Sequence, residues 1–350
     1  MESAGNVPDV ERPIFIVGTG RSGTTLLRSL LSAHSRIAVT PETHFMKWAD
    51  RNGLLGDGED FDRVWEEYTQ TWRFESLDVS AEDCCQIAKG LEGVPARTMF
   101  LAMLAAYGKR LEKPRVGEKS PSHVRYLDHL LGWYPDARVI VTQRDPRAVL
   151  ASKLRNPWVT SRLTPPSVRG GLLVASRVHA IVREAYDWAR VHQQIVPRWK
   201  DDPRVYVVAY ESLVRDPERE VRMVFDLLEE AFEPTVLTDR SSEKVVLPSA
   251  GAPDDELKDW GQEHHQKTLR PISEQSLDKW KTELSPSEVA LVEGVCEGGM
   301  VRTGYVPSTP SFRRAAGRSL ARGVIAGEAA EASVQHKLRT LRRRADQFSG

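Results

Sequence analysis

Short apolar runs alternate with segments of helical spacing along this chain. The runs are rich in β-branched residues, which is typical of buried strands. They are PIFIV (13–17), RIAVT (36–40), ARVIVT (137–142) and RVYVVAY (204–210). Each of the last three follows a helix-like or loop segment. This alternation predicts an α/β fold in which helices cover a mostly parallel sheet.

Longer segments between these runs have the spacing of amphipathic helices. From 171 to 199, apolar residues recur at helical intervals and predict one long helix. They are Val174, Val178, Ile181, Ala185, Trp188 and Ile195. Residues 60–85 are acidic and aromatic and predict a helical insertion. The polar segment 240–262 contains Pro and Gly and predicts a loop.

The final segment, residues 306–350, differs in charge from the rest of the chain. It has nine Lys and Arg against three Asp and Glu, and Val334, Leu338 and Leu341 have helical spacing. We therefore expect a basic C-terminal helical extension. A solvated or loosely docked helix is the simplest interpretation. The alternative is a contact with a membrane surface or a partner, including a second copy of the chain in a homodimer.

Composition places the chain among soluble proteins. Hydrophobic residues make up 40% and charged residues 28% of the 350 positions, which is ordinary for a globular enzyme. Lys and Arg together number 49, as do Asp and Glu, so we expect no nucleic-acid partner. Three cysteines are too few for a disulfide framework and match no zinc-ligand spacing, which favours a cytoplasmic location. The N-terminus has no apolar signal core and no apolar run reaches 18 residues, so we expect no transmembrane segment.

A glycine-rich loop follows the first predicted strand, in the sequence FIVGTGRSGTTLL (15–27). Gly18 and Gly23 have the spacing of the triphosphate-binding loop, and Thr25 occupies its Ser/Thr position. The Lys of that loop is replaced by Thr24, and Arg21 provides a cation from another position. Glycines let backbone N–H groups wrap an anion at a helix N-terminus, so the loop predicts a site for a terminal oxyanion.

A second motif, VIVTQRDPRAVLASK (139–153), joins another strand to a helix. Pro146 suits the first helical position, and Asp145 suits the cap before it. Arg144 at the strand end and Ser152 two turns into the helix could converge on a second anion. Alternatively, the motif contains only a capping Asp beside surface arginines. Parallel strands bind ligands at their carboxyl ends, which favours the paired anion sites.

Together, GTGRSGTTLL and TQRDPRAVLAS resemble the sulfotransferases that use 3′-phosphoadenosine 5′-phosphosulfate (PAPS). The resemblance is to bacterial-type members and to the motifs of tyrosylprotein sulfotransferases. It implies a single P-loop-type domain over residues 13–305, with the helical insertion at about 57–110 and the extension 306–350 outside it. It also implies that the first loop holds the 5′-phosphosulfate and that the second motif holds the 3′-phosphate. The matching residues are Gly20, Arg21, Ser22, Gly23, Thr24 and Thr25, and then Arg144 and Ser152.

Other elements of the chain extend this resemblance. PETHFM (41–46) looks like the segment with the family's catalytic Glu, here Glu42, and EKSP (118–121) resembles its Lys-containing element. YESLVRDP (210–217) resembles the element whose Tyr, here Tyr210, lies near the adenine. LRPISEQSLDKWKTELSP (269–286) looks like the segment that closes over the cofactor. It makes Arg270 and Lys279 candidate cofactor contacts.

The resemblance implies a metal-independent transfer of the sulfuryl group from PAPS to a hydroxyl, leaving PAP. Arg21 and Lys119 are of the right type to stabilise the leaving phosphate, and Glu42 is the leading general base. His44 and His123 are alternative bases. The acceptor stays open among a carbohydrate, a lipid, a natural product and a peptide tyrosine. A small-molecule kinase and a non-catalytic PAP-binding protein are the competing functions.

Overall fold

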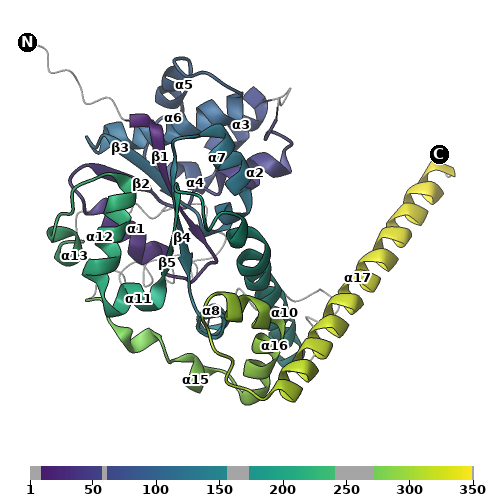
Figure 1. The fold of residues 1–350 in the computed structure, drawn as a ribbon. Coiled ribbons are helices and arrows are strands. Elements are labelled where there is room, and N and C mark those ends of the chain that lie inside the picture. Colours follow the sequence, from purple (N-terminus) through teal and green to yellow (C-terminus); the bar gives the residue numbers. More distant parts are fainter. Residues whose placement is uncertain (1–8, 57–60, 156–172, 241–270, 349–350) are drawn as a thin grey trace, which may run out of the picture. The chain divides into compact units, whose positions relative to one another are not determined.

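Five parallel strands form a sheet whose order is β2-β3-β1-β4-β5 (Figure 1). Their bounds are β1 (Asp9–Gly18), β2 (Ile37–Thr40), β3 (Arg115–Lys119), β4 (Arg138–Gln143) and β5 (Val205–Ala209). The computed structural model describes residues 9–56, 61–155, 173–240 and 271–348. The α/β fold with a parallel sheet, predicted from the alternating runs, is confirmed.

The four predicted strands coincide with β1, β2, β4 and β5, whereas β3 was not predicted. Its sequence, RVGEK, has charged residues at three of five positions, yet Arg115, Glu118 and Lys119 are at most 5% exposed. Gly117 lets β3 lie close to β1, because a Cβ atom there would stand 2.7 Å from the carbonyl oxygen of Ile14. A short strand with buried charged residues has the sequence pattern of a surface segment. Hydrophobic periodicity alone therefore does not predict β3.

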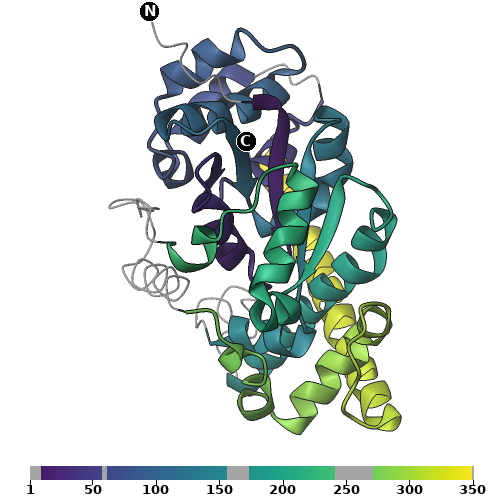
Figure 2. The ribbon, with the colours of Figure 1, turned by 60° about the vertical axis from the view of Figure 1, so that its left-hand side comes forward.

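Alternate residues of β1 face opposite sides of the sheet, and helices cover both sides. Ile14 and Ile16 belong to a core shared with α1 (Thr24–Ser32) and α12 (Pro217–Leu228). Phe15 faces the other way and stacks on Phe100 of α6 (Pro95–Arg110), with ring centroids 6.0 Å apart. Figure 2 gives a second view of these layers. Both faces are therefore apolar, as burial of a parallel sheet requires.

The segment between β2 and β3 is helical, as predicted for the insertion. It contains α2 (Phe45–Arg51), α3 (Phe61–Thr69), α4 (Trp72–Glu75), α5 (Ala81–Ala88) and α6. Phe45 stacks on Phe100 with ring centroids 5.0 Å apart and meets Tyr68 edge-on at 5.3 Å. This aromatic cluster fixes the start of α2, directly after the segment that contains Glu42.

The described residues form two compact units. The first comprises Met1–Arg144 and Ile195–Glu274 and contains the sheet, and the second comprises Asp145–Gln194 and Gln275–Gly350. The remaining elements of the first unit are η1 (Pro121–Tyr126), α7 (Leu127–Trp133), η3 (Val196–Arg198), α11 (Tyr210–Arg215) and α13 (Thr235–Thr238). The sulfotransferase-type domain over residues 13–305 with an extension at 306–350 stays a prediction.

The second unit is helical and has a core of its own. Its elements are α8 (Pro146–Leu154), α10 (Leu173–Arg190), α15 (Trp280–Glu283), α16 (Pro286–Arg302) and α17 (Ser311–Phe348). Two short elements, η2 (Val191–Ile195) and η4 (Glu274–Ser276), lie at the unit boundaries. The helix predicted over 171–199 is present as α10, and Trp188 in it is buried with Leu291 and Met300 of α16.

The basic extension forms α17, which packs along α16. Gly294 of α16 touches the backbone of Arg314, and Gly317 of α17 touches that of Ala290, so a Cβ atom at either glycine would clash. These close approaches place the first turns of α17 inside the second unit. Among the described residues, no helix is long and apolar enough to cross a membrane.

Candidate active site

The carboxyl ends of the five parallel strands meet at one edge of the sheet. Each end leads to a residue that the sequence singles out. Glu42 follows β2, Lys119 ends β3, Gly18 ends β1, Arg144 follows β4 and Tyr210 follows β5. The fold therefore gathers these residues, which are far apart in the sequence, along a single edge.

The loop between β1 and α1 is a tight turn with left-handed backbone at three positions. Gly18 has φ +148°, Arg21 +74° and Gly23 +94°. The amide of Ser22 donates to the carbonyl of Thr19 at 3.2 Å, and the two hydroxyls are 2.6 Å apart. Helix α1 begins at Thr24 with no side chain capping it. The first-turn N–H groups of a helix without a side-chain cap are donors of the kind that bind anions.

Tyr210 and Arg144 lie against this loop. The Tyr210 ring occupies the space next to Gly23, where any Cβ atom would clash with it. The Arg144 guanidinium lies 4.2 Å from the centroid of the same ring and donates to the carbonyl of Arg21 at 3.1 Å. Gly23 is thus required by both its backbone angle and its neighbour, and Arg144 is held beside the loop by stacking.

Glu42 pairs with two basic side chains at the ends of β2 and β3. Lys119 Nζ lies 2.6 Å from Glu42 Oε1, and His44 Nε2 lies 3.0 Å from Oε2. The Lys119 side chain is 6% exposed and that of Glu42 is 35% exposed, so the carboxylate is accessible while its cation is buried. Burial alone would raise the pKa of Glu42, but Lys119 and His44 outweigh it and hold that pKa well below its usual range.

Arg28 fixes the end of β2 just before Glu42. This side chain of α1 is 3% exposed, and its Nε donates to the carbonyls of Val39 and Thr40 at 3.0 Å each. An arginine within an amphipathic helix looks like a surface residue, so this role could not be predicted from the sequence. Arg28 therefore links helix α1 to β2, the strand that leads to Glu42.

A buried carboxylate, Glu118, supports the same segment from β3. It is fully buried and accepts hydrogen bonds from the amide and hydroxyl of Thr43, at 3.2 and 2.9 Å, and from the hydroxyl of Ser120. Ser120 in turn accepts from the amide of His44 at 3.1 Å. Glu118 is part of the EKSP element, but its network depends on residues 75 positions away. The sequence therefore did not identify it.

His123 is fully buried against this carboxylate. Its Nδ1 lies 3.1 Å from Oε2 of Glu118, and its ring meets Phe100 edge-on. Burial by itself would raise the pKa of Glu118, but His123 and the hydroxyls of Ser120 and Thr43 lower it below the usual range. His123 therefore lies beneath the segment that holds Glu42, whereas His44 is partly exposed beside Glu42 itself.

Replacing Glu118 by Gln should lower the free energy of unfolding by about 2–3 kcal/mol, because buried hydrogen bonds to a charged group are lost. The lowered pKa means that the carboxylate stabilises the fold above its unfolded pKa and ceases to do so as pH falls through the folded value. Urea denaturation of E118Q and parent at pH 7 and pH 4 measures this. The difference should shrink at the lower pH. Equal midpoints at pH 7, with the exposed Glu66→Gln as control, would contradict it.

The other predicted site residues belong to the second unit or lie outside the described residues. Asp145 caps α8 by accepting from the amide of Arg147 at 2.8 Å, as predicted, and Ser152 is 5% exposed two turns along that helix. Lys279 is exposed before α15, and Arg270 lies outside the described residues. Arg147 is buried over the ring of Trp280, 4.1 Å from its centroid. Trp280 thus packs in the core of the second unit.

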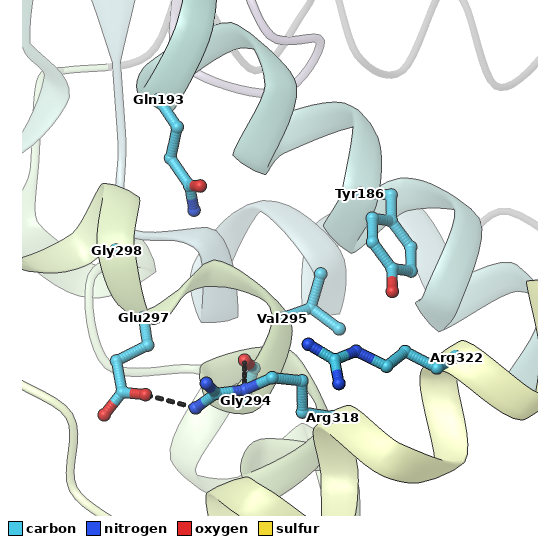
Figure 3. Close-up of a pocket in the computed structure, with 8 residues that line it drawn as sticks. All are labelled: Tyr186, Gln193, Gly294, Val295, Glu297, Gly298, Arg318 and Arg322. Carbon is cyan, nitrogen blue, oxygen red and sulfur yellow. Dashed lines mark hydrogen bonds and ion pairs between the residues drawn. The ribbon is translucent and has the colours of Figure 1, made fainter.

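A separate pocket in the second unit contains none of the predicted site residues. It lies among α10, α16 and α17 (Figure 3). Its lining is Tyr186, Gln193, Gly294, Val295, Glu297, Gly298, Arg318 and Arg322. Among the described residues, no group of His, Cys, Asp and Glu side chains is arranged to hold a metal ion.

Two solved structures resemble the fold. The sulfotransferase domain from the curacin biosynthetic pathway superposes with a TM-score of 0.55 at 22% identity, covering 84% of this chain and 98% of that domain. The corresponding domain of the Synechococcus PCC 7002 olefin synthase gives 0.53 at 23% identity, covering 87% and 98%. At these identities the likeness establishes the arrangement of strands and helices.

Sequence relatives point to the same group. Nodulation protein NoeE of Sinorhizobium fredii (strain NBRC 101917 / NGR234) is 27% identical over 312 residues, covering 86% of this chain and 68% of NoeE. The protein-tyrosine sulfotransferase of Drosophila melanogaster is 23% identical over 267 residues, covering 76% of this chain and 46% of that protein. The chain thus spans about half the length of the Drosophila relative. The model of the sulfotransferase family matches residues 13–234, well over half of the sequence, and the chain belongs to that family.

Proposed function

We propose that this chain transfers a sulfuryl group from PAPS to a hydroxyl of an acceptor. The observation that carries the proposal is the ion pair of Glu42 and Lys119 on the sheet edge that also bears the glycine-rich loop. A carboxylate and an ammonium beside an anion-binding loop supply a proton acceptor and a charge stabiliser for the same reaction. Membership of the sulfotransferase family supports this reading.

In this proposal the loop after β1 binds the 5′-phosphosulfate. Gly20, Ser22 and Gly23 shape the backbone around the anion, and the first-turn N–H groups of α1 point their positive end at it. The hydroxyls of Thr24 and Thr25 and the guanidinium of Arg21 complete the proposed donor set. These residue types suit three sulfuryl oxygens without the Lys that a triphosphate loop uses.

Arg144 is the proposed partner of the 3′-phosphate. Its stacking on Tyr210 leaves the planar guanidinium oriented by a rigid ring, which favours two-point binding of an oxyanion. Tyr210 stands beside Gly23, so its ring would separate the two anion sites at the position where a nucleoside joins them. The roles of Ser152, Lys279 and Arg270 in cofactor binding stay predictions.

The transfer itself is proposed to be an in-line displacement. The acceptor hydroxyl gives its proton to Glu42 as its oxygen attacks sulfur, and the sulfur–oxygen bond to the leaving phosphate breaks. Lys119 stabilises the charge that develops on that phosphate oxygen. A phosphate that draws Lys119 away from Glu42 also raises the pKa of the carboxylate, so Glu42 becomes a better base when the donor is bound. No step is assigned to a metal.

The two histidines take different places in this mechanism. His44 touches Glu42 and is accessible, so it either orients the carboxylate or accepts the proton in its stead. His123 is buried beneath, against Glu118, and is better suited to positioning than to contact with an acceptor. The histidine variants described in the Discussion separate these roles.

The function is tested by incubating the full chain with sulfur-labelled PAPS and mixed acceptors in buffer containing EDTA. Labelled product identified by mass spectrometry supports sulfuryl transfer and reveals the acceptor class: carbohydrate, lipid, natural product or tyrosine. Transfer of phosphate from ATP that requires magnesium would instead favour a kinase. Stabilisation of the protein by PAP without turnover on any acceptor would favour a binding protein.

Replacing Arg144 by Ala should weaken PAP binding about 10–100-fold, because a charge-assisted pair with the 3′-phosphate is lost. Calorimetric titration of PAP against parent and R144A measures the change. Adenosine 5′-phosphosulfate lacks the 3′-phosphate, so its affinity should change much less. An equal loss for both ligands would mean that Arg144 acts only by supporting the loop through the carbonyl of Arg21.

A further inference from the structure

Large apolar side chains are exposed at one place in the second unit. Among the described residues, five large hydrophobic side chains are exposed, and four of them lie between positions 301 and 320. They are Val301 (68%), Val306 (78%), Phe312 (70%) and Leu320 (54%). The first three belong to the turn where α16 ends and α17 begins, here called the hairpin tip (residues 301–313). Several large apolar side chains exposed within one stretch of chain are typical of an interaction surface.

The hairpin tip is held firmly by buried polar contacts. Glu293 of α16 is fully buried and accepts from the amides of Ser308 and Thr309, at 2.7 and 2.8 Å. Arg147 Nη1 also pairs with Oε1 of this carboxylate at 2.7 Å. The hydrogen bonds to Glu293 therefore fix the backbone of the tip. The apolar side chains of this rigid turn are exposed to solvent.

The stretch of chain that contains the hairpin tip has charged residues of one sign, with Glu297 directly before it. From 298 to 327 the sequence contains five arginines and no Asp or Glu, although the whole chain has equal numbers of acidic and basic residues. Two of these arginines, Arg314 and Arg318, form ion pairs with Glu297. Figure 3 shows the pair of Arg318 and Glu297. Arg302 and Arg313 are exposed within the tip, next to its apolar side chains. Farther along α17, residues 334–348 add five Lys and Arg against one Asp.

We propose that the hairpin tip docks on an anionic lipid surface. Val306 and Phe312 would enter the boundary between headgroups and acyl chains, while Arg302 and Arg313 contact anionic headgroups. Exposed apolar side chains and exposed arginines in one stretch of chain are the two signals that reversible membrane binding needs.

The test is co-sedimentation of the full chain with vesicles. Parent protein should bind phosphatidylcholine vesicles containing 30% phosphatidylglycerol. This binding should weaken as the salt concentration is raised. Binding to vesicles of pure phosphatidylcholine should be poor. Val306→Glu and Phe312→Glu should each reduce partitioning at least tenfold, and Arg313→Gln about fivefold. Met223→Glu is the matched control, because Met223 is a large apolar residue of the first unit that is also exposed, at 43%. These side chains are exposed, so circular dichroism and the thermal midpoint should be unchanged.

Two results would overturn the proposal. One is parent protein that stays in the supernatant with anionic vesicles, or F312E that sediments as well as parent does. The other is self-association in analytical ultracentrifugation that V306E and F312E abolish while vesicle binding is absent, which would assign the tip to a second copy of the chain. Loss of vesicle binding in V306E and F312E, with M223E unaffected and sulfuryl transfer to a soluble acceptor retained, would support it. Vesicle binding is measured without PAPS, so its outcome is independent of the proposed reaction.

Discussion

Replacing Glu42 by Gln is expected to lower kcat by about 10²–10⁴-fold, because the proposed proton acceptor is removed. The amide keeps the size of the carboxylate, so the surrounding segment, fixed by Arg28 and Glu118, should stay in place. PAP affinity should change little, since Glu42 is not proposed to bind the nucleotide. Single-turnover rates with labelled PAPS and titration with PAP measure the two effects separately.

The controls for this prediction separate the base from its neighbours. Glu66→Gln removes an exposed carboxylate from α3 of the same unit and should leave both measurements unchanged. His44→Gln should lower kcat less than Glu42→Gln does if the histidine only orients the carboxylate. A near-normal kcat in E42Q together with a large loss in H44Q would make His44 the base. A loss confined to His123→Gln, with a lowered unfolding midpoint, would indicate structural support from His123.

Replacing Lys119 by Ala is expected to lower kcat by about 10²–10³-fold. This is the loss that other enzymes show when one group that stabilises a developing oxyanion is removed. A second effect follows from the ion pair. In the parent, Glu42 has a lowered pKa, so it stays ionised and causes no loss of rate as pH falls from 8 to 5. In K119A the carboxylate loses its cation while burial, which raises the pKa, remains. The rate of K119A should therefore decline at a higher pH than that of the parent.

The pH dependence of kcat/KM, recorded for K119A, Lys119→Arg and parent, measures this shift. K119R keeps the charge and should keep the parent's acid limb, even if its rate is reduced by altered geometry. Parallel profiles for K119A and parent would show that Lys119 does not control the ionisation of Glu42. A lower rate with an unchanged profile would leave Lys119 a role in charge stabilisation alone.

The glycine-rich loop and the second motif were recognisable in the sequence because their structure is local. A glycine that needs a positive φ, an apolar strand before it and a helix after it lie within about 15 residues of one another. Gly18 and Gly23 have positive φ, as that expectation requires, whereas the positive φ of Arg21 was not indicated by the sequence. Likewise, the Asp145 cap and the start of α8 at Pro146 depend only on neighbouring residues.

The support of Glu42 could not be predicted in this way. Lys119 and Glu42 were both singled out by resemblance, but their contact joins positions 77 apart and exists because β2 and β3 are neighbours. Arg28 and Glu118 look like surface charges in the sequence, yet both are buried and bind the backbone near Glu42. A buried charge is identified by its partners, and these partners come together only when the strands are ordered.

By itself, the sequence determined the α/β class, four of the five strands, the two strand-to-helix motifs and the family, since each depends on local pattern or on motif spacing. Only the tertiary structure decided that β3, with its three charged residues, lies inside the sheet beside β1. It also decided the pairing of Glu42 with Lys119, the division into two units, and the exposure of Val306 and Phe312 on a rigid turn. The physical reason is the same in each case. Burial and pairing are properties of residues distant in the chain, and hydrophobic periodicity contains no information about which distant residues meet.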